Sequence, residues 1–313
     1  MMLWDCLSLK KIAIDTISEV LECTEQDIVD VEILKKGMTN RSILFRVVHG
    51  DKKGKYILRI PGEGTNLIID RTREADVYRA IKGKGLCDNP VYINQNNGLK
   101  ITRYIENARV CDARSEEDIR KCMMKLREFH EMKLEVNHTF DIFTQIDFYE
   151  KLWGGIPSVH KDYRKTKENI NNLKNIINSF DKNWCLTHID AIPDNFLFYS
   201  TDNGTEELQL MDWEYSGMQD PHIDIAMFCI YSMYDLGEID QVIDIYFENE
   251  CNDDIRLKIY CYIAICGLLW SNWCEYKRNL GIEFGKYSDV QYQYAKEYYD
   301  RVQVILCKNI LEE

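Results

Sequence analysis

The chain contains the segment Leu186-Thr-His-Ile-Asp-Ala-Ile-Pro-Asp-Asn-Phe-Leu-Phe198 and, after a polar turn, Leu210-Met-Asp-Trp-Glu214. Four polar residues form the pattern H-x-D-x-x-x-x-N, followed by a carboxylate after an apolar strand: His188, Asp190, Asn195 and Asp212. Asp190 is a candidate acceptor for the proton of a hydroxyl group. Asn195 and Asp212 offer the hard oxygen ligands that Mg²⁺ prefers. A proton acceptor and two metal ligands at this spacing predict phosphoryl transfer from a nucleotide.

The same spacing is typical of the protein-kinase catalytic loop, where Asp and Asn stand five residues apart and a later Asp supplies a second metal ligand. This likeness predicts an α+β, two-lobed protein-kinase-like fold acting on a small molecule, with ATP and Mg²⁺ as cofactors. An isolated His-x-Asp motif is mostly structural, but its coincidence with Asn195 and Asp212 favours a kinase. His188, grouped with the catalytic residues, is expected to brace the loop. Glu214 is either a further metal ligand or a hydrogen-bonded support.

Hydrophobic periodicity changes near residues 104–108, which predicts two lobes. Residues 1–104 are predicted to form a small nucleotide-binding lobe with an antiparallel sheet and a helix over Arg71–Ile81. Residues 105–313 are predicted to form a larger, mostly helical lobe for catalysis and substrate binding. The expected strands of the first lobe are Val31–Leu34, Ser42–Val48, Tyr56–Ile60, Val91–Ile93 and Leu99–Tyr104. The expected helices that begin the second lobe are Ser115–Met132, Phe143–Lys151 and Asp162–Phe180.

The composition is ordinary for a globular protein, with 45% hydrophobic and 29% charged residues. Lys and Arg number 39 against 52 Asp and Glu, a net charge of −13 that argues against a nucleic-acid partner. The 12 cysteines include no C-x-x-C pair, and the longest apolar run, Ile259–Trp270, is too short to span a bilayer. No signal peptide is evident at the start. We therefore expect a cytoplasmic protein with no membrane and no obligatory protein partner.

Nucleotide-binding residues are expected in the first lobe. The segment Lys36-Gly-Met-Thr-Asn40 lies between two expected strands; one Gly in a hairpin is usually a turn, but the kinase context favours a phosphate-covering loop. The contacts expected from this loop are Gly37, Thr39 and Asn40. Arg59 stands in the strand where a kinase places its phosphate-binding Lys, and Glu74 on the next helix is its expected ion-pair partner. An Arg keeps the charge of that Lys but changes its geometry.

Aromatic residues gather in the last third of the chain. Leu268-Leu-Trp-Ser-Asn-Trp273 places two tryptophans on one helical face, and Ile282-Glu-Phe-Gly-Lys-Tyr287 adds further rings. Such a stripe is by default core packing. It is also how proteins hold a quaternary ammonium group, through cation–π attraction of about 0.5–2 kcal/mol per ring. The residues alone leave both interpretations open.

Together these segments resemble the choline/ethanolamine kinases, especially the bacterial LicA-type choline kinases. Gly37-Met-Thr-Asn40 is one of the specific parts. The most specific are Asp212-Trp-Glu-Tyr-Ser216 through Asp220-Pro and Asp224, then Trp270-Ser-Asn-Trp273 with Glu283-Phe-Gly285. The resemblance implies transfer of the γ-phosphate of ATP to the hydroxyl of choline. It also implies an aromatic box around the substrate, made by Trp270, Trp273, Phe284 and Tyr287.

The chain departs from the family at Tyr231, where members usually have a Glu that faces the cationic head group. A ring suits a quaternary ammonium, but a primary ammonium needs charged acceptors, so we expect choline over ethanolamine. The alternatives are a kinase for ethanolamine, an aminoglycoside or another small hydroxyl acceptor, and a ligand-binding pseudokinase. A complete set of Asp190, Asn195 and Asp212 argues against the pseudokinase.

Overall fold

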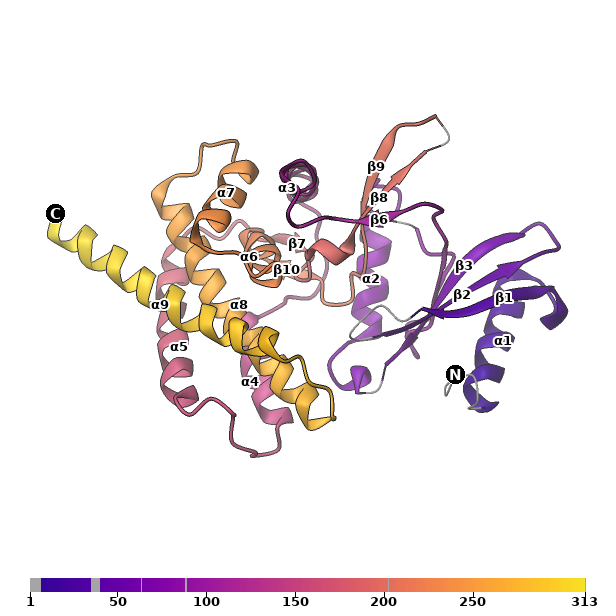
Figure 1. The fold of residues 1–313 in the computed structure, drawn as a ribbon, viewed down its shortest axis with the longest axis horizontal. Helices are drawn as coiled ribbons and strands as arrows, with labels where there is room; N and C mark the ends of the chain where they lie inside the picture. Colours follow the sequence, from indigo (N-terminus) through magenta and orange to yellow (C-terminus); the bar gives the residue numbers. More distant parts are fainter. Residues whose placement is uncertain (1–6, 35–39, 63, 88, 202, 313) are drawn as a thin grey trace. The chain divides into compact units, whose positions relative to one another are not determined.

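The computed structural model describes residues 7–34, 40–62, 64–87, 89–201 and 203–312 (Figure 1). The chain divides into two compact units, one of residues 1–108 with 199–214 and the other of residues 109–198 with 215–313. The first unit therefore includes a hairpin that the sequence analysis assigned to the second lobe. A functional division at residue 104 stays a prediction.

The first unit is built on an antiparallel sheet with the strand order β1-β2-β3-β5-β4. Its strands are β1 (Ile28–Leu34), β2 (Asn40–Val47), β3 (Gly54–Pro61), β4 (Tyr92–Ile93) and β5 (Lys100–Arg103). The strands predicted for this region are confirmed, with bounds that differ by a few residues. The one helix predicted among them is confirmed as α2 (Arg71–Ile81), whose first turn is capped by the Asp70 side chain.

Alternation along β3 gives the sheet two different faces. Tyr56 and Leu58 join a buried apolar cluster with Ile17 of α1 (Leu7–Leu21), the helix drawn beside β1 and β2 in Figure 1. Because successive side chains of a strand point to opposite faces, Arg59 faces away from that cluster. It bonds instead to Glu74 of α2. The pleat of β3 therefore separates the hydrophobic core of this unit from its charged face.

The second unit is mostly helical, as predicted. Its helices are α3 (Glu116–Glu131), α4 (Ile142–Leu152), α5 (Tyr163–Ser179), α6 (His222–Tyr231), α7 (Leu236–Tyr246), α8 (Asp253–Asn279) and α9 (Lys286–Glu312). Four of them begin at side chains that accept a backbone N–H of the first turn: Ser115, Asp141, Asp235 and Asn252.

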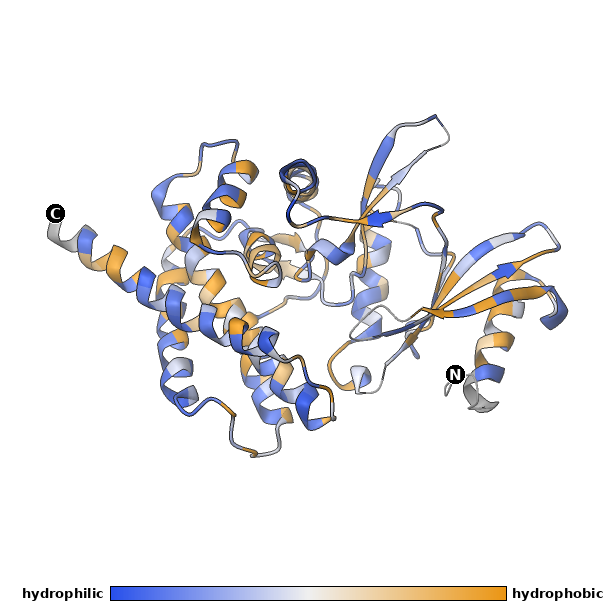
Figure 2. Ribbon diagram, viewed as in Figure 1, coloured by the Kyte–Doolittle hydropathy of each residue, from blue (hydrophilic) through white to orange (hydrophobic). Residues whose placement is uncertain are grey.

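Helix α8 is the centre of the second unit. It is buried from Leu257 to Lys277 and packs against α4, α5, α6 and α9, and Figure 2 shows hydrophobic residues along its middle. At Gly267 a side chain would meet the carbonyl oxygen of Gln291 at 2.6 Å, so glycine permits the close approach of α9. No helix in the described part of the chain has the length and apolarity needed to cross a bilayer.

Short strands frame the segments around the predicted catalytic residues. In the second unit β7 (Cys185–Thr187) pairs antiparallel with β10 (Gly217–Gln219). The sheet order β6-β8-β9 joins β6 (Arg109–Val110), β8 (Phe196–Ser200) and β9 (Glu206–Leu210). The segment 188–195 lies between β7 and β8, and Asp212 follows β9 directly. These are the positions that the sequence pattern predicted.

Candidate active site

Asp190 and Asn195 lie together in the loop between β7 and β8. The Ile192 N–H donates to the carbonyl of Asp190 at 2.8 Å, and a 3₁₀ turn over Pro193–Asn195 follows. This turn brings the Asn195 side-chain amide to 2.8 Å from the Asp190 carbonyl and 3.1 Å from its carboxylate. The half-buried Asp190 is therefore oriented by the amide that was predicted as its metal-binding neighbour.

The residue before Asp190 has a strained backbone. Ile189 has φ +71°, a conformation that β-branched residues rarely adopt. Its N–H donates to the carboxylate of Asp224 at 2.7 Å, and the N–H of His188 donates to the same carboxylate at 2.9 Å. Asp224 is completely buried in the first turn of α6, and its other partner is His130 Nε2 at 3.0 Å. The sequence analysis assigned no role to Asp224.

His188 is fully buried beside the same loop. Its carbonyl accepts a hydrogen bond from the Ser216 hydroxyl at 3.1 Å, and its N–H is held by Asp224. These main-chain contacts are what a residue that braces the loop would make. They support that role for His188 over a chemical one.

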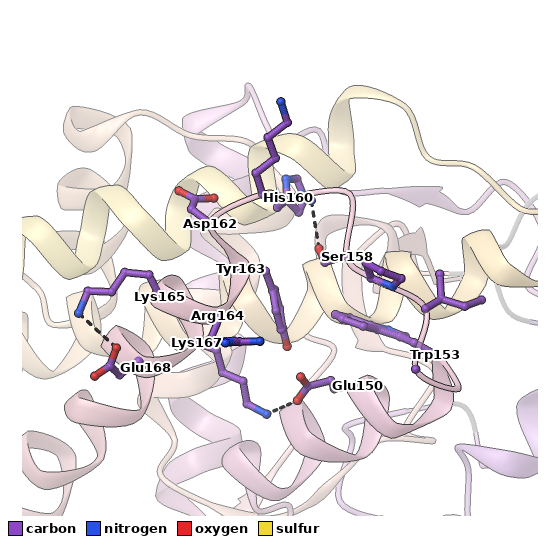
Figure 3. A pocket seen from close by; sticks show the side chains of 14 residues that line it. Glu150, Trp153, Ser158, His160, Asp162, Tyr163, Arg164, Lys165, Lys167 and Glu168 are labelled. Carbon is purple, nitrogen blue, oxygen red and sulfur yellow. Dashed lines mark hydrogen bonds and ion pairs between the residues drawn. The ribbon is translucent and has the colours of Figure 1, made fainter.

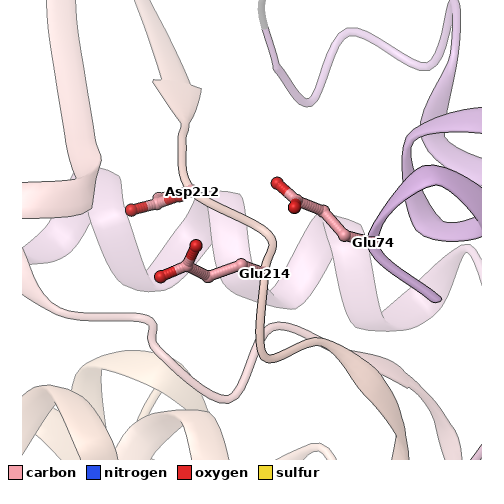
Figure 4. Close-up of side chains that lie close together, drawn as sticks. All are labelled: Glu74, Asp212 and Glu214. Carbon is pink, nitrogen blue, oxygen red and sulfur yellow. The ribbon is translucent and has the colours of Figure 1, made fainter. Parts of the chain in front are cut away.

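Three carboxylates converge in the first unit: Glu74 on α2, and Asp212 and Glu214 after β9 (Figure 4). One oxygen from each lies within 4.8 Å of the others. Asp212 has φ +62°, and its side chain is 34% exposed, so a bound ion would have access to it. Glu74 was predicted only as an ion-pair partner, and the structure places it in the same cluster.

Arg59, on strand β3, contacts all three carboxylates of this cluster. Its guanidinium donates two hydrogen bonds to Glu74, at 2.5 and 2.9 Å, and one to the carbonyl of Gly98 at 3.0 Å. It lies 3.4 Å from Asp212 and 3.5 Å from Glu214. The expected Arg59–Glu74 ion pair is present in the bidentate form that only Arg can make.

The surroundings shift the pKa values of Glu74 and Glu214 in opposite directions. Burial opposes ionisation of Glu74, but the charge and hydrogen bonds of Arg59 outweigh it and lower the pKa of Glu74 to about 2. Burial and the negative charge of Asp212 raise the pKa of Glu214, although Arg59 and Arg71 act in the opposite direction. Carboxylate oxygens are the ligands that a hard divalent cation such as Mg²⁺ prefers.

Two further side chains bind Glu214. Arg71 donates to it at 3.0 Å and also to Glu74 at 2.8 Å, so it links the two carboxylates. The Asn40 amide donates to Glu214 at 2.9 Å. Asn40 was expected to contact the nucleotide, and Arg71 was given no role. Gly37 and Thr39, the other expected contacts of that loop, lie outside the described residues.

The predicted aromatic residues of the second unit form two contact groups. In the first group Trp270 lies 5.5 Å from Trp273, and Trp273 lies 5.0 Å from Phe284, measured between ring centroids. In the second, Tyr231 and Tyr287 meet edge to face at 5.9 Å. Trp270 and Trp273 are 8% and 2% exposed, so both tryptophans also serve the core.

The second aromatic group is close enough to Asp190 to respond to its charge. Burial raises the pKa of Tyr231, and the carboxylates of Asp194 and Asp190 raise it further. Burial also raises the pKa of Tyr287 well above its usual range, with Asp190 among the nearby charges that contribute. Rings that could surround a cationic head group thus lie near the carboxylate that would accept the hydroxyl proton.

A separate cavity of about 1020 Å³ lies between the end of α4 and the start of α5 (Figure 3). Trp153, Ser158, His160 and Tyr163 are among its lining residues, and two of its charged pairs are Lys165–Glu168 and Lys167–Glu150. Its lining includes none of the residues predicted for nucleotide or substrate binding.

Comparison with known proteins agrees with this arrangement. The sequence model of the choline/ethanolamine kinase family matches residues 31–245. The chain belongs to the choline/ethanolamine kinase family. Members transfer phosphate to an alcohol, so the protein is a phosphotransferase with an alcohol group as acceptor. The family and the two-lobed kinase-like fold expected from the sequence are confirmed.

Individual relatives cover most of the chain. Protein LicA of Haemophilus influenzae is 27% identical over 277 residues, which span 80% of this chain and 75% of that protein. The crystal structure of choline kinase LicA from Streptococcus pneumoniae matches with a TM-score of 0.79 and 28% identity, over 94% of this chain and 99% of that one. Aminoglycoside 2'-phosphotransferase-IIIa, at 15% identity and a TM-score of 0.62 over 94% and 99% of the two chains, shares the fold.

Proposed function

We propose that this family member is a cytoplasmic choline kinase that transfers the γ-phosphate of ATP to the hydroxyl of choline. The observation that carries the proposal is that Tyr231 donates to Asp194, in the loop that bears Asp190, at 2.6 Å, while its ring meets Tyr287 at 5.9 Å. Choline phosphorylation needs such a cation-binding surface beside a proton acceptor. A relative of known structure, choline kinase LicA from Streptococcus pneumoniae, supports the same substrate. A second LicA structure, 27% identical with a TM-score of 0.78, contains AMP and supports nucleotide binding.

In this proposal Asp190 accepts or orients the proton of the attacking hydroxyl, and Asn195 holds the carboxylate in place. Arg59, aligned by Glu74, directs a positive charge to the nucleotide phosphates. Gly37, Thr39 and Asn40 remain the proposed phosphate-loop contacts.

The proposed metal ligands are Asn195, Asp212 and Glu214. When bound, Mg²⁺ would neutralise charge on the phosphates during transfer. Asn40 and Arg71 both donate to Glu214, so in this proposal the carboxylate also supports the first unit.

The acceptor would lie among Trp270, Trp273, Phe284, Tyr231 and Tyr287. A trimethylammonium group has no N–H to donate, so rings and a nearby negative charge satisfy it, whereas a primary ammonium would leave its three donors short of acceptors. This difference is the basis for choline over ethanolamine.

The test is ADP release by the purified protein with Mg²⁺-ATP and, in parallel, choline, ethanolamine or kanamycin. We expect release that depends on choline and on Mg²⁺, and its loss in Asp190→Ala with folding unchanged by circular dichroism. Release only with ethanolamine or kanamycin would keep the phosphotransferase and reject choline. Substantial choline turnover by Asp190→Ala would reject the role of Asp190.

A further inference from the structure

Tyr231 stands where the family resemblance leads us to expect a Glu, and its side chain is hydrogen-bonded to a carboxylate. Its hydroxyl donates to Asp194 Oδ2 at 2.6 Å. Tyr231 is the last residue of α6, and Asp194 stands in the 3₁₀ turn directly before Asn195. A long-range contact within the second unit therefore brings a negative charge to the hydroxyl end of the Tyr231 side chain.

Asp194 is available to a ligand. It is exposed, and among the described residues it is in no ion pair, so no protein cation of this part of the chain neutralises it. Its one described hydrogen bond occupies Oδ2 and comes from a neutral phenol. Burial and the adjacent carboxylate keep that phenol protonated, so it continues to donate.

The bonded pair also lies against the aromatic residues. The ring of Tyr231 meets Tyr287 at 5.9 Å, and Tyr287 follows Phe284, whose carbonyl accepts its N–H at 3.2 Å. Phe284 in turn packs on Trp273. One continuous path of contacts thus connects Asp194 with the rings of the predicted box.

We infer that Asp194 supplies the anionic contact for the cationic head of the acceptor and that Tyr231 is the positioning residue that holds its carboxylate. This inference rests on the proposed choline kinase activity and names a specificity-determining residue for it. The carboxylate attracts a quaternary ammonium by charge alone, without a hydrogen bond, so it separates a cationic alcohol from a neutral one of equal shape. The family's Glu would thus be replaced by a pair, one residue for charge and one for position.

The experiment compares choline with 3,3-dimethylbutan-1-ol, in which a tert-butyl group replaces trimethylammonium. Steady-state kcat and KM are measured for both alcohols in the wild type, Asp194→Asn and Tyr231→Phe. In Asp194→Asn we expect KM for choline to rise about fivefold, in the range for a partly exposed charge pair, with kcat changed far less. The preference for choline over the neutral alcohol should fall by the same factor. Tyr231→Phe should shift both quantities in the same direction by less.

A rescue variant tests whether the effect of Asp194→Asn comes from the lost charge or from a change in the structure of the loop. Asp194→Asn combined with Tyr231→Glu moves the negative charge to α6 and should restore most of the preference for choline. The matched control is Asp181→Asn, an exposed Asp of the same unit outside the site, which should keep wild-type values. Melting temperatures of all variants exclude unfolding as the cause.

The possible failures are distinguishable. An unchanged choline preference in Asp194→Asn, or an equal loss with both alcohols, overturns the role of Asp194 while choline kinase activity stands. A wild-type protein that does not phosphorylate choline overturns the proposed function and this inference with it.

Discussion

The carboxylate of Asp224 accepts the backbone N–H of Ile189 at a distance of 2.7 Å. Ile189 has φ +71° and precedes Asp190, so a buried acid in α6 holds the strained turn that presents the proposed proton acceptor. Strain of this kind persists only where surrounding contacts enforce it. The position of Asp190 therefore depends on Asp224, which lies 35 positions after Ile189 in the chain.

Replacing Asp224 by Ala should remove that support. Three donors would lose their acceptor, the N–H groups of Ile189 and His188 and His130 Nε2, which we expect to lower the free energy of unfolding by about 3 kcal/mol or more. We also expect kcat to fall by about 100-fold at a temperature where the variant is folded. Urea unfolding and steady-state kinetics measure the two effects. Asp181→Ala, at an exposed position, is the control, and near-wild-type kcat in folded Asp224→Ala would contradict the argument.

Arg59→Lys should weaken nucleotide use although the charge is kept. Lys cannot reproduce the two hydrogen bonds to Glu74 together with the one to the Gly98 carbonyl. We expect kcat/KM for ATP to fall by about 10- to 100-fold, while KM for choline changes little. The control is Arg79→Lys on the exposed side of α2. Equal losses for both substrates would point to general unfolding and reject a nucleotide-specific role.

Asp212→Asn tests the metal site. The amide keeps the size of the side chain but removes the charge that attracts a divalent ion. By isothermal titration calorimetry, the gain in ADP affinity on adding Mg²⁺ should shrink at least about tenfold, with affinity for metal-free ADP altered far less. If Mg²⁺ strengthens ADP binding equally in the variant and the wild type, Asp212 is not a ligand.

His222 should make stability depend on pH. Burial, together with the positive charge of Lys258, lowers its pKa from 6.5 to about 4, against the opposing effect of Asp220. The unfolded chain therefore takes up a proton near pH 6.5 while the folded protein does not. Above pH 7 the group has no effect, and as pH falls from 6.5 to 4 it costs up to about 3 kcal/mol of stability.

The measurement is urea unfolding of the wild type and His222→Asn between pH 4 and 8. The difference in unfolding free energy between the two proteins should change across the window from pH 6.5 to 4 and be constant above pH 7. Taking this difference removes the contributions of the other histidines to the pH dependence, because both proteins contain them. A flat difference curve over the whole range would show that His222 titrates normally.

Local features of the structure were predictable from the sequence. The Arg71–Ile81 helix follows from residues at three- and four-residue spacings within one short segment, and the structure adds the Asp70 cap. Asp190 and Asn195 are five positions apart, so a single turn joins them. The Arg59–Glu74 ion pair was also predicted from the sequence. The two residues are 15 positions apart, on a strand and on the helix that follows it, as in the protein-kinase pattern.

The residues to which the sequence analysis gave no role act over long separations. Asp224 binds the loop at His188 from 36 positions away, and Asp194 meets Tyr231 across 37. Arg71 reaches Glu214 across 143. The residues around an Asp or an Arg in the sequence do not indicate which distant residue it will contact. Such a hydrogen bond depends on which surfaces pack together and not on periodicity.

The amino-acid sequence by itself determined the family and the order of strands and helices, and it named the candidate reacting groups, because periodicity and short motifs are encoded over a few neighbouring residues. Only the tertiary structure decided how those groups are held. It placed Asp224 under the strained Ile189 and a carboxylate beside Tyr231. The reason is physical: burial and directed hydrogen bonds arise only when distant segments come into contact, and their energies depend on that contact.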